Sequence, residues 1–327
     1  MSRHKPVPSG LSTVTDPPQG FFNRLGVVRF RIIVIVCVVA MLALIVYAAS
    51  KPSNGRPNPP VVSTSSVPPT ANPSLGTGQL DPPDQPELAQ TIAYLENKYQ
   101  VSLGVALAPI SVPGRSIMRP WQAGSLSTGL AWQTLDTAIA VAVLREPKQP
   151  EDSEYLLRRA LHESSPAGST ALWQFLGVDT DAAAKTLAVL AANGDSSTQI
   201  PINTADPGIP PYPQTRWGLA NQAAFVGAMY CTTEGQLVLK QLTSLQRDFT
   251  YGLALLPGAA VRSGFGVELG GATSVRQAAI VSLPNGVPYA VSVQVVAVDA
   301  TLDTAKATLN ELAPAILAFS HGITGYC

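Results

Sequence analysis

The chain of 327 residues has little charge, few histidines and few cysteines. Charged residues make up 13% of the sequence, and the 21 basic and 21 acidic side chains balance to a formal net charge of zero. Outside the N-terminal tail there is no basic cluster with interleaved aromatic residues, the pattern typical of nucleic-acid binding. We therefore expect no nucleic-acid partner.

The common catalytic and metal-binding motifs are also missing. The three histidines and three cysteines do not have the spacing of a zinc site, and the chain has no glycine-rich nucleotide loop and no Gly-x-Ser-x-Gly turn. The pattern Ser-x-x-Lys occurs once, from Ser2 to Lys5 in the N-terminal tail. We expect no metal and no cofactor.

One long apolar run is present, over residues 32–50, and it carries no charge. As a helix it would span roughly 28 Å, enough to cross a bilayer. The tail of residues 1–31 contains five Lys or Arg side chains against the single acid Asp16, so the positive-inside rule places the N-terminus in the cytoplasm. We predict a single-pass cell-membrane anchor with everything after it extracytoplasmic. The alternative is a signal peptide cleaved after residues 46–48.

Residues 51–83 are rich in Pro, Ser and Thr, with Pro-Pro pairs at 59–60, 68–69 and 82–83. Such a segment has too few large apolar residues to form a core, so it is predicted to be an extended linker. The remaining residues, 84–327, are long enough for one domain.

Two of the three cysteines fall in that domain. Cys37 lies in the apolar run, whereas Cys231 and Cys327 would lie outside the membrane, where oxidation is permitted. We predict a Cys231–Cys327 disulfide; two free thiols are the alternative.

The order of predicted elements indicates an α+β fold. Asp84 and Glu87 are typical of a helix cap, and a strand pattern follows over residues 101–107. Helices are predicted at 132–145, 151–163, 167–177, 181–193, 217–231 and 233–246. Strand patterns follow at 251–256, 259–267, 274–283 and 287–298, with a hairpin turn at 284–286, and a last helix carries residues 302–316. Strands from both ends of the domain are expected to share one antiparallel sheet.

The segment Ala131-Trp132-Gln133-Thr134-Leu135-Asp136 resembles the nucleophile helix of serine β-lactamases and penicillin-binding transpeptidases. In that superfamily an Ala-Trp pair commonly precedes Ser-x-x-Lys, in which the lysine helps to deprotonate the serine. Here Gln133 and Asp136 stand at the serine and lysine positions. The alternative is an ordinary buried helix with Asp136 as a first-turn carboxylate.

A second motif of that superfamily, Ser-Asp-Asn or a relative, falls on Ser164-Ser165-Pro166 when counted back from the Leu-Trp and Leu-Gly pattern of residues 172–177. The serine is kept at Ser164, but Pro166 has no amide to present to a substrate. The alternative is plain helix punctuation, with serine at the cap and proline in the first turn.

A third motif, Lys-Thr-Gly, resembles Arg262-Ser263-Gly264. The resemblance implies that Ser164, Arg262, Ser263 and Gly264 bind a ligand, since a guanidinium can hold a carboxylate with two hydrogen bonds; a surface arginine on an edge strand is the alternative. Residues 275–277 and 212–217 also resemble actinobacterial members, although Thr215 as a helix cap would explain the second segment without function.

The resemblance covers residues 84–327 and implies an antiparallel sheet flanked by helices, beside an all-helical subdomain. It also implies an ion pair between Asp136 and Arg262, because these residues replace the two lysines of an active site. The degenerate site comprises Gln133, Asp136, Ser164, Pro166, Arg262 and Ser263, and none of them is expected to act as a nucleophile. The expected function is that of a catalytically inactive cell-envelope binding or scaffold protein, with cell-wall peptide or another envelope protein as its ligand. The alternatives are a divergent serine hydrolase that acts on cell-wall peptide or a β-lactam through Ser125, Ser127 or Ser164, and a purely structural envelope protein without a ligand.

Overall fold

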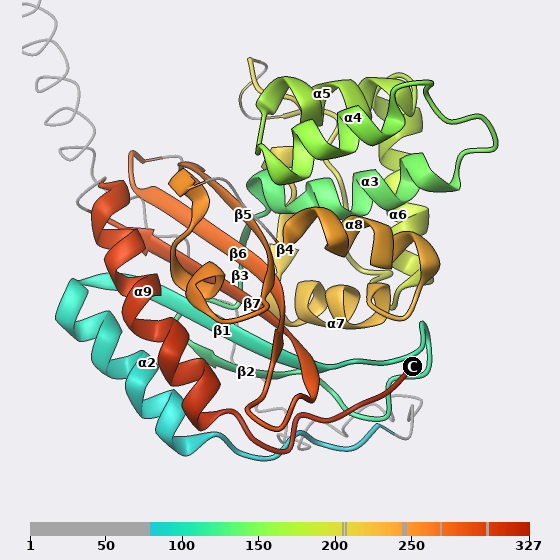
Figure 1. Ribbon diagram of the computed structural model, residues 1–327. Coiled ribbons are helices and arrows are strands. Elements are labelled where there is room, and N and C mark those ends of the chain that lie inside the picture. The colour runs from blue at the N-terminus through green and yellow to red at the C-terminus, as the bar shows by residue number, and fades with distance from the viewer. Residues whose placement is uncertain (1–78, 205, 207, 244–246, 269, 299–300) are drawn as a thin grey trace, which may run out of the picture. The chain divides into compact units, whose positions relative to one another are not determined.

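The computed structural model describes residues 79–327 except 205, 207, 244–246, 269 and 299–300 (Figure 1). The predicted membrane helix and Cys37 lie outside the described residues, as does the predicted linker apart from its last five residues. Among the described residues no helix is long and apolar enough to cross a membrane.

The centre of the fold is a five-stranded antiparallel sheet with the strand order β2-β1-β7-β6-β5. Its strands are β1 (Val101–Pro109), β2 (Trp121–Gly124), β5 (Ala260–Val267), β6 (Thr273–Ser282) and β7 (Pro288–Ala297). Because β1 pairs with β7 along its whole length, the two ends of the domain share one sheet, as the sequence predicts. The β6–β7 turn has Gly286 at φ +83°, the left-handed conformation that favours glycine.

One face of the sheet is covered by α2 (Pro86–Tyr99) and α9 (Leu302–Phe319), which lie side by side in Figure 1. Alternate strand positions supply the large apolar side chains of this layer, such as Leu103, Val105 and Leu107 in β1. Helix α2 begins at Pro86 after Gln85, and no side chain caps it, so the predicted Asp84 cap is wrong. Proline in the first turn replaces the cap, since its missing amide would have had no partner there.

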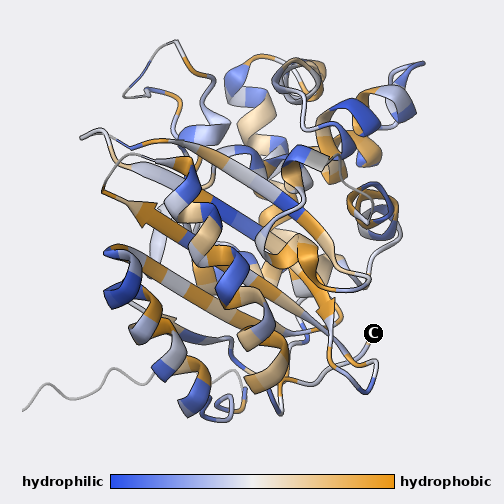
Figure 2. Ribbon diagram, turned by 60° about the vertical axis from the view of Figure 1, so that its left-hand side comes forward, coloured by the Kyte–Doolittle hydropathy of each residue, from blue (hydrophilic) through white to orange (hydrophobic). Residues whose placement is uncertain are grey.

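The other face of the sheet carries small residues, because α7 (Leu219–Met229) packs closely against it. Ala106, Ala108 and Ala290 lie in this layer. A side chain on Gly227 of α7 would meet the Pro109 carbonyl at 2.5 Å, so only glycine permits that approach. Hydrophilic positions also interrupt the apolar strands in Figure 2. The buried polar residues of these strands include Arg262, Arg276, Gln277 and Gln294.

A helical region stands beside the sheet, built around the buried helix α3 (Asp136–Arg145) (Figure 1). Eight of the ten residues of α3 are buried, which its run of small apolar side chains permits. The surrounding helices are α4 (Ser153–Leu157) with the π turn η2 (Arg158–His162), α5 (Pro166–Phe175), α6 (Asp179–Ala192) and α8 (Thr233–Leu242). The predicted all-helical subdomain is therefore present.

Two sequence predictions of secondary structure are wrong. The predicted strand at 251–256 contains the 3₁₀ helix η5 (Gly252–Leu255), in which Gly252 has φ +58°. The predicted helix at 217–231 begins two residues late, because β4 (Arg216–Gly218) pairs with β3 (Thr128–Leu130). The residue before α7 is consequently Gly218, and Thr215 caps no helix. In both places contacts with distant segments override the local pattern.

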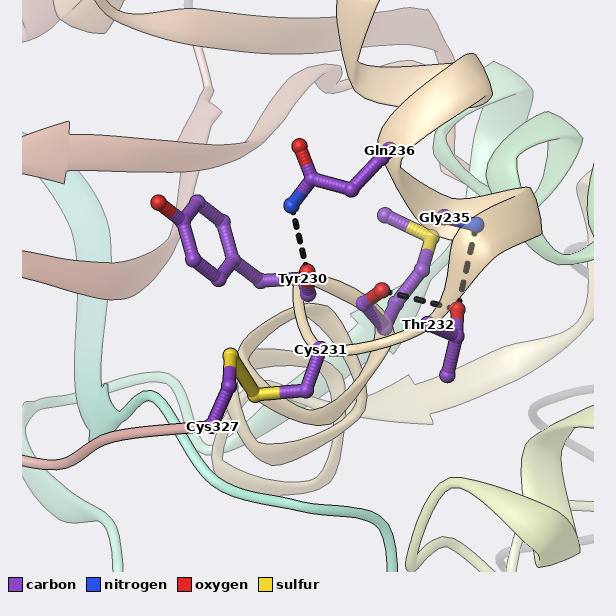
Figure 3. Close-up of a disulfide and its surroundings, with 7 residues drawn as sticks. Tyr230, Cys231, Thr232, Gly235, Gln236 and Cys327 are labelled. Atoms are coloured by element: carbon purple, nitrogen blue, oxygen red, sulfur yellow. Dashed lines mark hydrogen bonds between the residues drawn. A yellow bond between two sulfur atoms is a disulfide. The ribbon is translucent and has the colours of Figure 1, made fainter.

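The predicted disulfide joins Cys231 to Cys327, with the two Cα atoms 5.2 Å apart (Figure 3). Cys231 follows the end of α7, and the Thr232 hydroxyl next to it accepts the Gly235 amide and caps α8. The bridge therefore fastens the last residue described to the junction between two helices.

Candidate active site

The candidate site lies where the edge strand β5 meets the 3₁₀ turn η1 (Trp132–Leu135), which leads directly into α3. The strand and the turn approach each other closely, because a Cβ atom on Gly264 would stand 2.7 Å from the backbone nitrogen of Gln133. Glycine at position 264 thus permits Gln133 and Asp136 to lie against the strand that carries Arg262.

Asp136 and Arg262 form the predicted ion pair, and both side chains are 0% exposed. Arg262 Nη2 donates to Asp136 Oδ2 at 2.5 Å. The remaining donors of the guanidinium serve the Gln133 carbonyl at 3.0 Å and the Ser164 hydroxyl at 2.7 Å, with a longer contact to the Leu161 carbonyl. The ion pair joins β5 to α3, and Ser164 adds the loop that precedes α5.

Burial raises the pKa of the Asp136 carboxyl group, while the charge of Arg262 and a hydrogen bond from Ser169 act in the opposite direction. The Ser169 hydroxyl donates to Asp136 Oδ2 at 2.6 Å. Burial also raises the pKa of Tyr212, and the nearby Asp136 carboxylate adds to that rise. Tyr212 therefore keeps its proton at neutral pH and cannot serve as a general base.

Gln133, which the resemblance places at the nucleophile position, has its side chain hydrogen-bonded within the site. Its side-chain oxygen Oε1 accepts a hydrogen bond from the Phe265 amide at 3.1 Å, on the edge of β5. Acyl transfer requires free N–H donors beside the nucleophile to stabilise the oxyanion. Here the Phe265 N–H, on the strand facing Gln133, is already taken by that side chain.

The Ser164-Ser165-Pro166 segment begins α5. Ser165 is the N-cap residue and its hydroxyl accepts the Gly168 amide at 3.3 Å, while Pro166 is the first helical residue. Ser164 precedes the cap in a left-handed conformation, with φ +51°, and presents its hydroxyl to Arg262. The segment therefore forms the N-terminal cap of α5, and its Ser164 also contributes one hydrogen bond to the buried ion pair.

Ser263 does not join Arg262 at the site. Successive side chains of a strand point to opposite faces of the sheet. The Ser263 hydroxyl accepts from Gln277 Nε2 at 2.9 Å, and the same Gln277 amide donates to the Tyr251 carbonyl next to η5. Arg262 and Ser263 are both buried, so the expectation that they hold one ligand together is not met. Binding through Ser164 and Gly264 stays a prediction.

A second buried arginine, Arg276 on β6, lies in the polar layer between the sheet and α7. It donates to the side-chain oxygens of Gln222 at 2.7 Å and Gln294 at 3.0 Å, and to the Trp217 carbonyl at 3.0 Å. Burial lowers the pKa of Arg276 to about 9. Residues 275–277 drew attention to Arg276 through their resemblance to superfamily sequences. Its hydrogen-bonding partners, which also include the Gly129 carbonyl, come from four separate elements, β3, β4, α7 and β7.

Ser125, one of the serines proposed for a divergent hydrolase, belongs to a structural hydrogen-bond network. Both its hydroxyl and its amide donate to Glu96 Oε1, which also accepts the Leu103 amide at 2.9 Å. Glu96 thus links α2 to β1 and to the residue that follows β2. Among the described residues no hydrogen bond joins a histidine to a serine, and no group of three or more His, Cys, Asp or Glu side chains is placed to hold a metal.

A cavity of about 390 Å³ lies next to the candidate site, with Trp132, the residue before Gln133, in its lining. Its lining includes Trp132 and Val267 but none of Gln133, Asp136 and Arg262. The sequence analysis identified Gln133, Asp136 and Arg262 as candidate site residues but did not predict the neighbouring cavity. Its lining residues come from β3, η1, β4, the end of β5 and positions between Gln199 and Gln214, and no local sequence pattern connects these segments.

No known protein-family profile matches the sequence, and no curated protein matches it. Solved structures do match. A variant of the last common ancestor of Gram-negative class A β-lactamases superposes with a TM-score of 0.54 at 20% identity, over 72% of this chain and 98% of that one. The chromosome-encoded β-lactamase of Vibrio parahaemolyticus gives 0.55 at 15% identity, over 71% and 98%. The TLA-3 extended-spectrum β-lactamase gives 0.55 at 15%, over 72% and 99%. The described domain thus has the fold of the class A serine β-lactamases.

Proposed function

We propose that this protein is a β-lactamase-fold domain without hydrolase activity, which is held in the cell envelope and works by reversible binding. The observation that carries the proposal is the fully buried Asp136–Arg262 ion pair beneath Gln133. It occupies the positions where the resemblance would place the two lysines of an active site. The pair joins β5 to α3, and both of its charged groups are fully buried and hydrogen-bonded to other groups of the protein.

Chemistry at this site would need a nucleophile, a base and oxyanion donors. Gln133 supplies no hydroxyl, and its own side chain holds the Phe265 amide. Arg262 and Ser169 both donate to Oδ2 of Asp136, and Oδ1 is buried without a partner, so the carboxylate is closed off from any substrate. Each of the three requirements fails for a separate structural reason, and one substitution would not restore activity.

The alternative, a divergent hydrolase, has Ser164 as its most favourable candidate because that hydroxyl lies beside the ion pair. However, the Ser164 oxygen accepts a hydrogen bond from Arg262 and contacts no base among the described residues. A guanidinium stays protonated, so it cannot activate the hydroxyl. The geometry therefore favours binding over hydrolysis.

The envelope location rests on the sequence, through the apolar run at 32–50 and the Pro-rich linker that follows. A domain displayed beyond the membrane on such a spacer can reach cell-wall peptide or other envelope proteins, which we propose as its ligand class. The fold supports this proposal by analogy, since enzymes of this superfamily recognise related ligands.

The test is incubation of the full-length chain with a fluorescent penicillin, followed by denaturing electrophoresis and intact mass measurement, with an active class A β-lactamase as the positive control. We expect no covalent adduct and no hydrolysis. A stoichiometric adduct would refute the proposal, and peptide mapping would then assign it among Ser125, Ser127 and Ser164. A Ser164→Ala variant that lost the adduct would identify that serine.

A further inference from the structure

The cavity beside Trp132 has the size and lining of a small-molecule site. Its volume of about 390 Å³ lies within the range of about 300–1,000 Å³ found for ligand pockets. Leu130, Ile209 and Val267 give it an apolar wall. Val267 is 64% exposed at the end of β5, so the cavity reaches the surface there.

Hydrogen bonds fix the cavity wall that carries the lining residues from Gln199 to Gln214. Just before this wall Asp195 accepts from Trp217 Nε1 at 2.7 Å, from the Thr198 hydroxyl at 2.6 Å and from Asn221 at 3.1 Å. Within the wall Gln214 Nε2 donates to the carbonyls of Asp206 at 2.8 Å and Ile209 at 2.9 Å. A wall held in this way is preformed, which lowers the entropic cost of binding.

Two side chains that line the cavity have donors without partners. The indole N–H of Trp132 is buried and makes no hydrogen bond to any described residue, although the side chain is only 5% exposed. Such an N–H costs free energy unless an acceptor reaches it. Arg216, exposed at the cavity, has no ion pair or hydrogen bond from its side chain within the described part of the chain.

Backbone strain fixes the position of Trp132. It has φ +48°, an unfavourable value for a residue with a side chain, and its ring lies against Gly266, where a Cβ atom would stand 2.3 Å from Cζ3. Strained residues of this kind persist where the surrounding structure holds them, and they occur often at functional sites. The fold thus keeps the indole in the wall of the cavity.

We infer that this cavity binds a small organic acid with an apolar or aromatic body. The body fills the space between Leu130, Ile209 and Val267 beside the Trp132 ring, and the carboxylate pairs with Arg216. Asp206 also lines the cavity, and its Oδ1 accepts the Gly208 amide at 2.8 Å, which partly offsets its charge. The inference rests on the proposed function, because it supplies the site of reversible binding.

The probe for the test is 4-(trifluoromethyl)phenylacetate. Its fluorine NMR signal is recorded with the full-length chain in detergent and, for comparison, in detergent without protein. We expect saturable line broadening with a dissociation constant on the order of 1 mM or below, as typical ligand efficiencies give for a molecule of this size. The neutral amide of the same acid should bind at least about fivefold more weakly, because it loses the charge pairing with Arg216.

Three variants locate the site. Arg216→Gln should weaken binding of the acid about fivefold and leave binding of the amide unchanged, and Val267→Trp should abolish binding of both by filling the cavity. Trp132→Phe replaces the indole in the cavity lining by a smaller ring, so it should weaken binding about threefold to tenfold through lost apolar contact. Arg145→Gln, the same charge loss at an exposed arginine on α3 away from the cavity lining, serves as the control and should change nothing.

Equal affinities for acid and amide, or binding that survives both Arg216→Gln and Val267→Trp, would overturn the inference, as would the absence of saturable binding. Arg216 and Val267 are both exposed, so these two variants are expected to fold even if Trp132→Phe does not. A negative titration without a penicillin adduct would remove this site and leave the proposed function standing. A penicillin adduct would refute the proposed function instead.

Discussion

Replacing Asp136 by Asn tests whether the buried ion pair organises the fold. The variant keeps the shape of the side chain but leaves the Arg262 guanidinium, 0% exposed, without a counter-charge. Removing one partner of a buried pair typically costs about 3–5 kcal/mol, because the remaining charge stays desolvated. Native domains are stable by about 5–15 kcal/mol, so the loss would be a large fraction of the total.

The free energy of unfolding is measured by urea titration, followed by tryptophan fluorescence and circular dichroism, on the full-length chain. For a domain of about 250 residues each kcal/mol lowers the Tm by roughly 2–4 °C, so we expect a decrease of about 6–20 °C. Glu151→Gln, the loss of an exposed carboxylate that has no hydrogen bond within the described residues, is the matched control and should change stability by less than about 0.5 kcal/mol.

The double variant Asp136→Leu with Arg262→Met separates charge from packing. Replacing a buried ion pair by apolar residues of similar volume is often neutral or stabilising, so the double variant should recover most of the stability that Asp136→Asn loses. A loss below about 1 kcal/mol in Asp136→Asn, the value of an exposed ion pair, would refute the reasoning. A double variant no more stable than Asp136→Asn would show that the contacts of Arg262 with Gln133 and Ser164 matter more than its charge.

Three further predictions concern other parts of the domain. Unfolding without reductant should expose one reactive thiol, that of Cys37, since Cys231 and Cys327 are joined; three thiols would contradict the bridge, and Cys327→Ser should lower the free energy of unfolding by about 2–5 kcal/mol. Hydrogen bonds from Lys98 and Tyr99 lower the pKa of Glu311 in the folded state. The stability that Glu311 contributes is therefore present above its unfolded pKa and lost as pH falls through its folded pKa. If Glu311→Gln left the decrease of the free energy of unfolding at acidic pH unchanged, that result would count against this. Gly266→Ala should destabilise by about 1–3 kcal/mol, because the new methyl group meets the Trp132 ring, and a Tm equal to that of the parent would show that the ring can move aside.

The sequence alone determined the parts of the fold that depend on local pattern. Alternating apolar residues predicted β5, β6 and β7, and the turn at 284–286 joined the last two strands, because a hairpin of this length forms from neighbouring residues. The sequence also shows that position 133 has no serine and that Asp136 and Arg262 carry opposite charges. These features sufficed to predict the ion pair once the resemblance had brought the two segments together.

Only the tertiary structure decided which polar side chains share a site. Ser263 was assigned beside Arg262 from a motif, although the two-residue period of a strand sends its hydroxyl to the opposite face, toward Gln277. The 3₁₀ turn η5 replaced a predicted strand because its residues pack against α9 rather than beside another strand. The residues that line the cavity at Trp132 lie between positions 130 and 267 of the chain. Only the placement of these segments in space shows that the Trp132 N–H and the Arg216 side chain have no hydrogen-bonding partner among the described residues. Local sequence patterns specify helices, strands and turns, whereas burial and hydrogen bonding between distant residues are properties of the assembled fold.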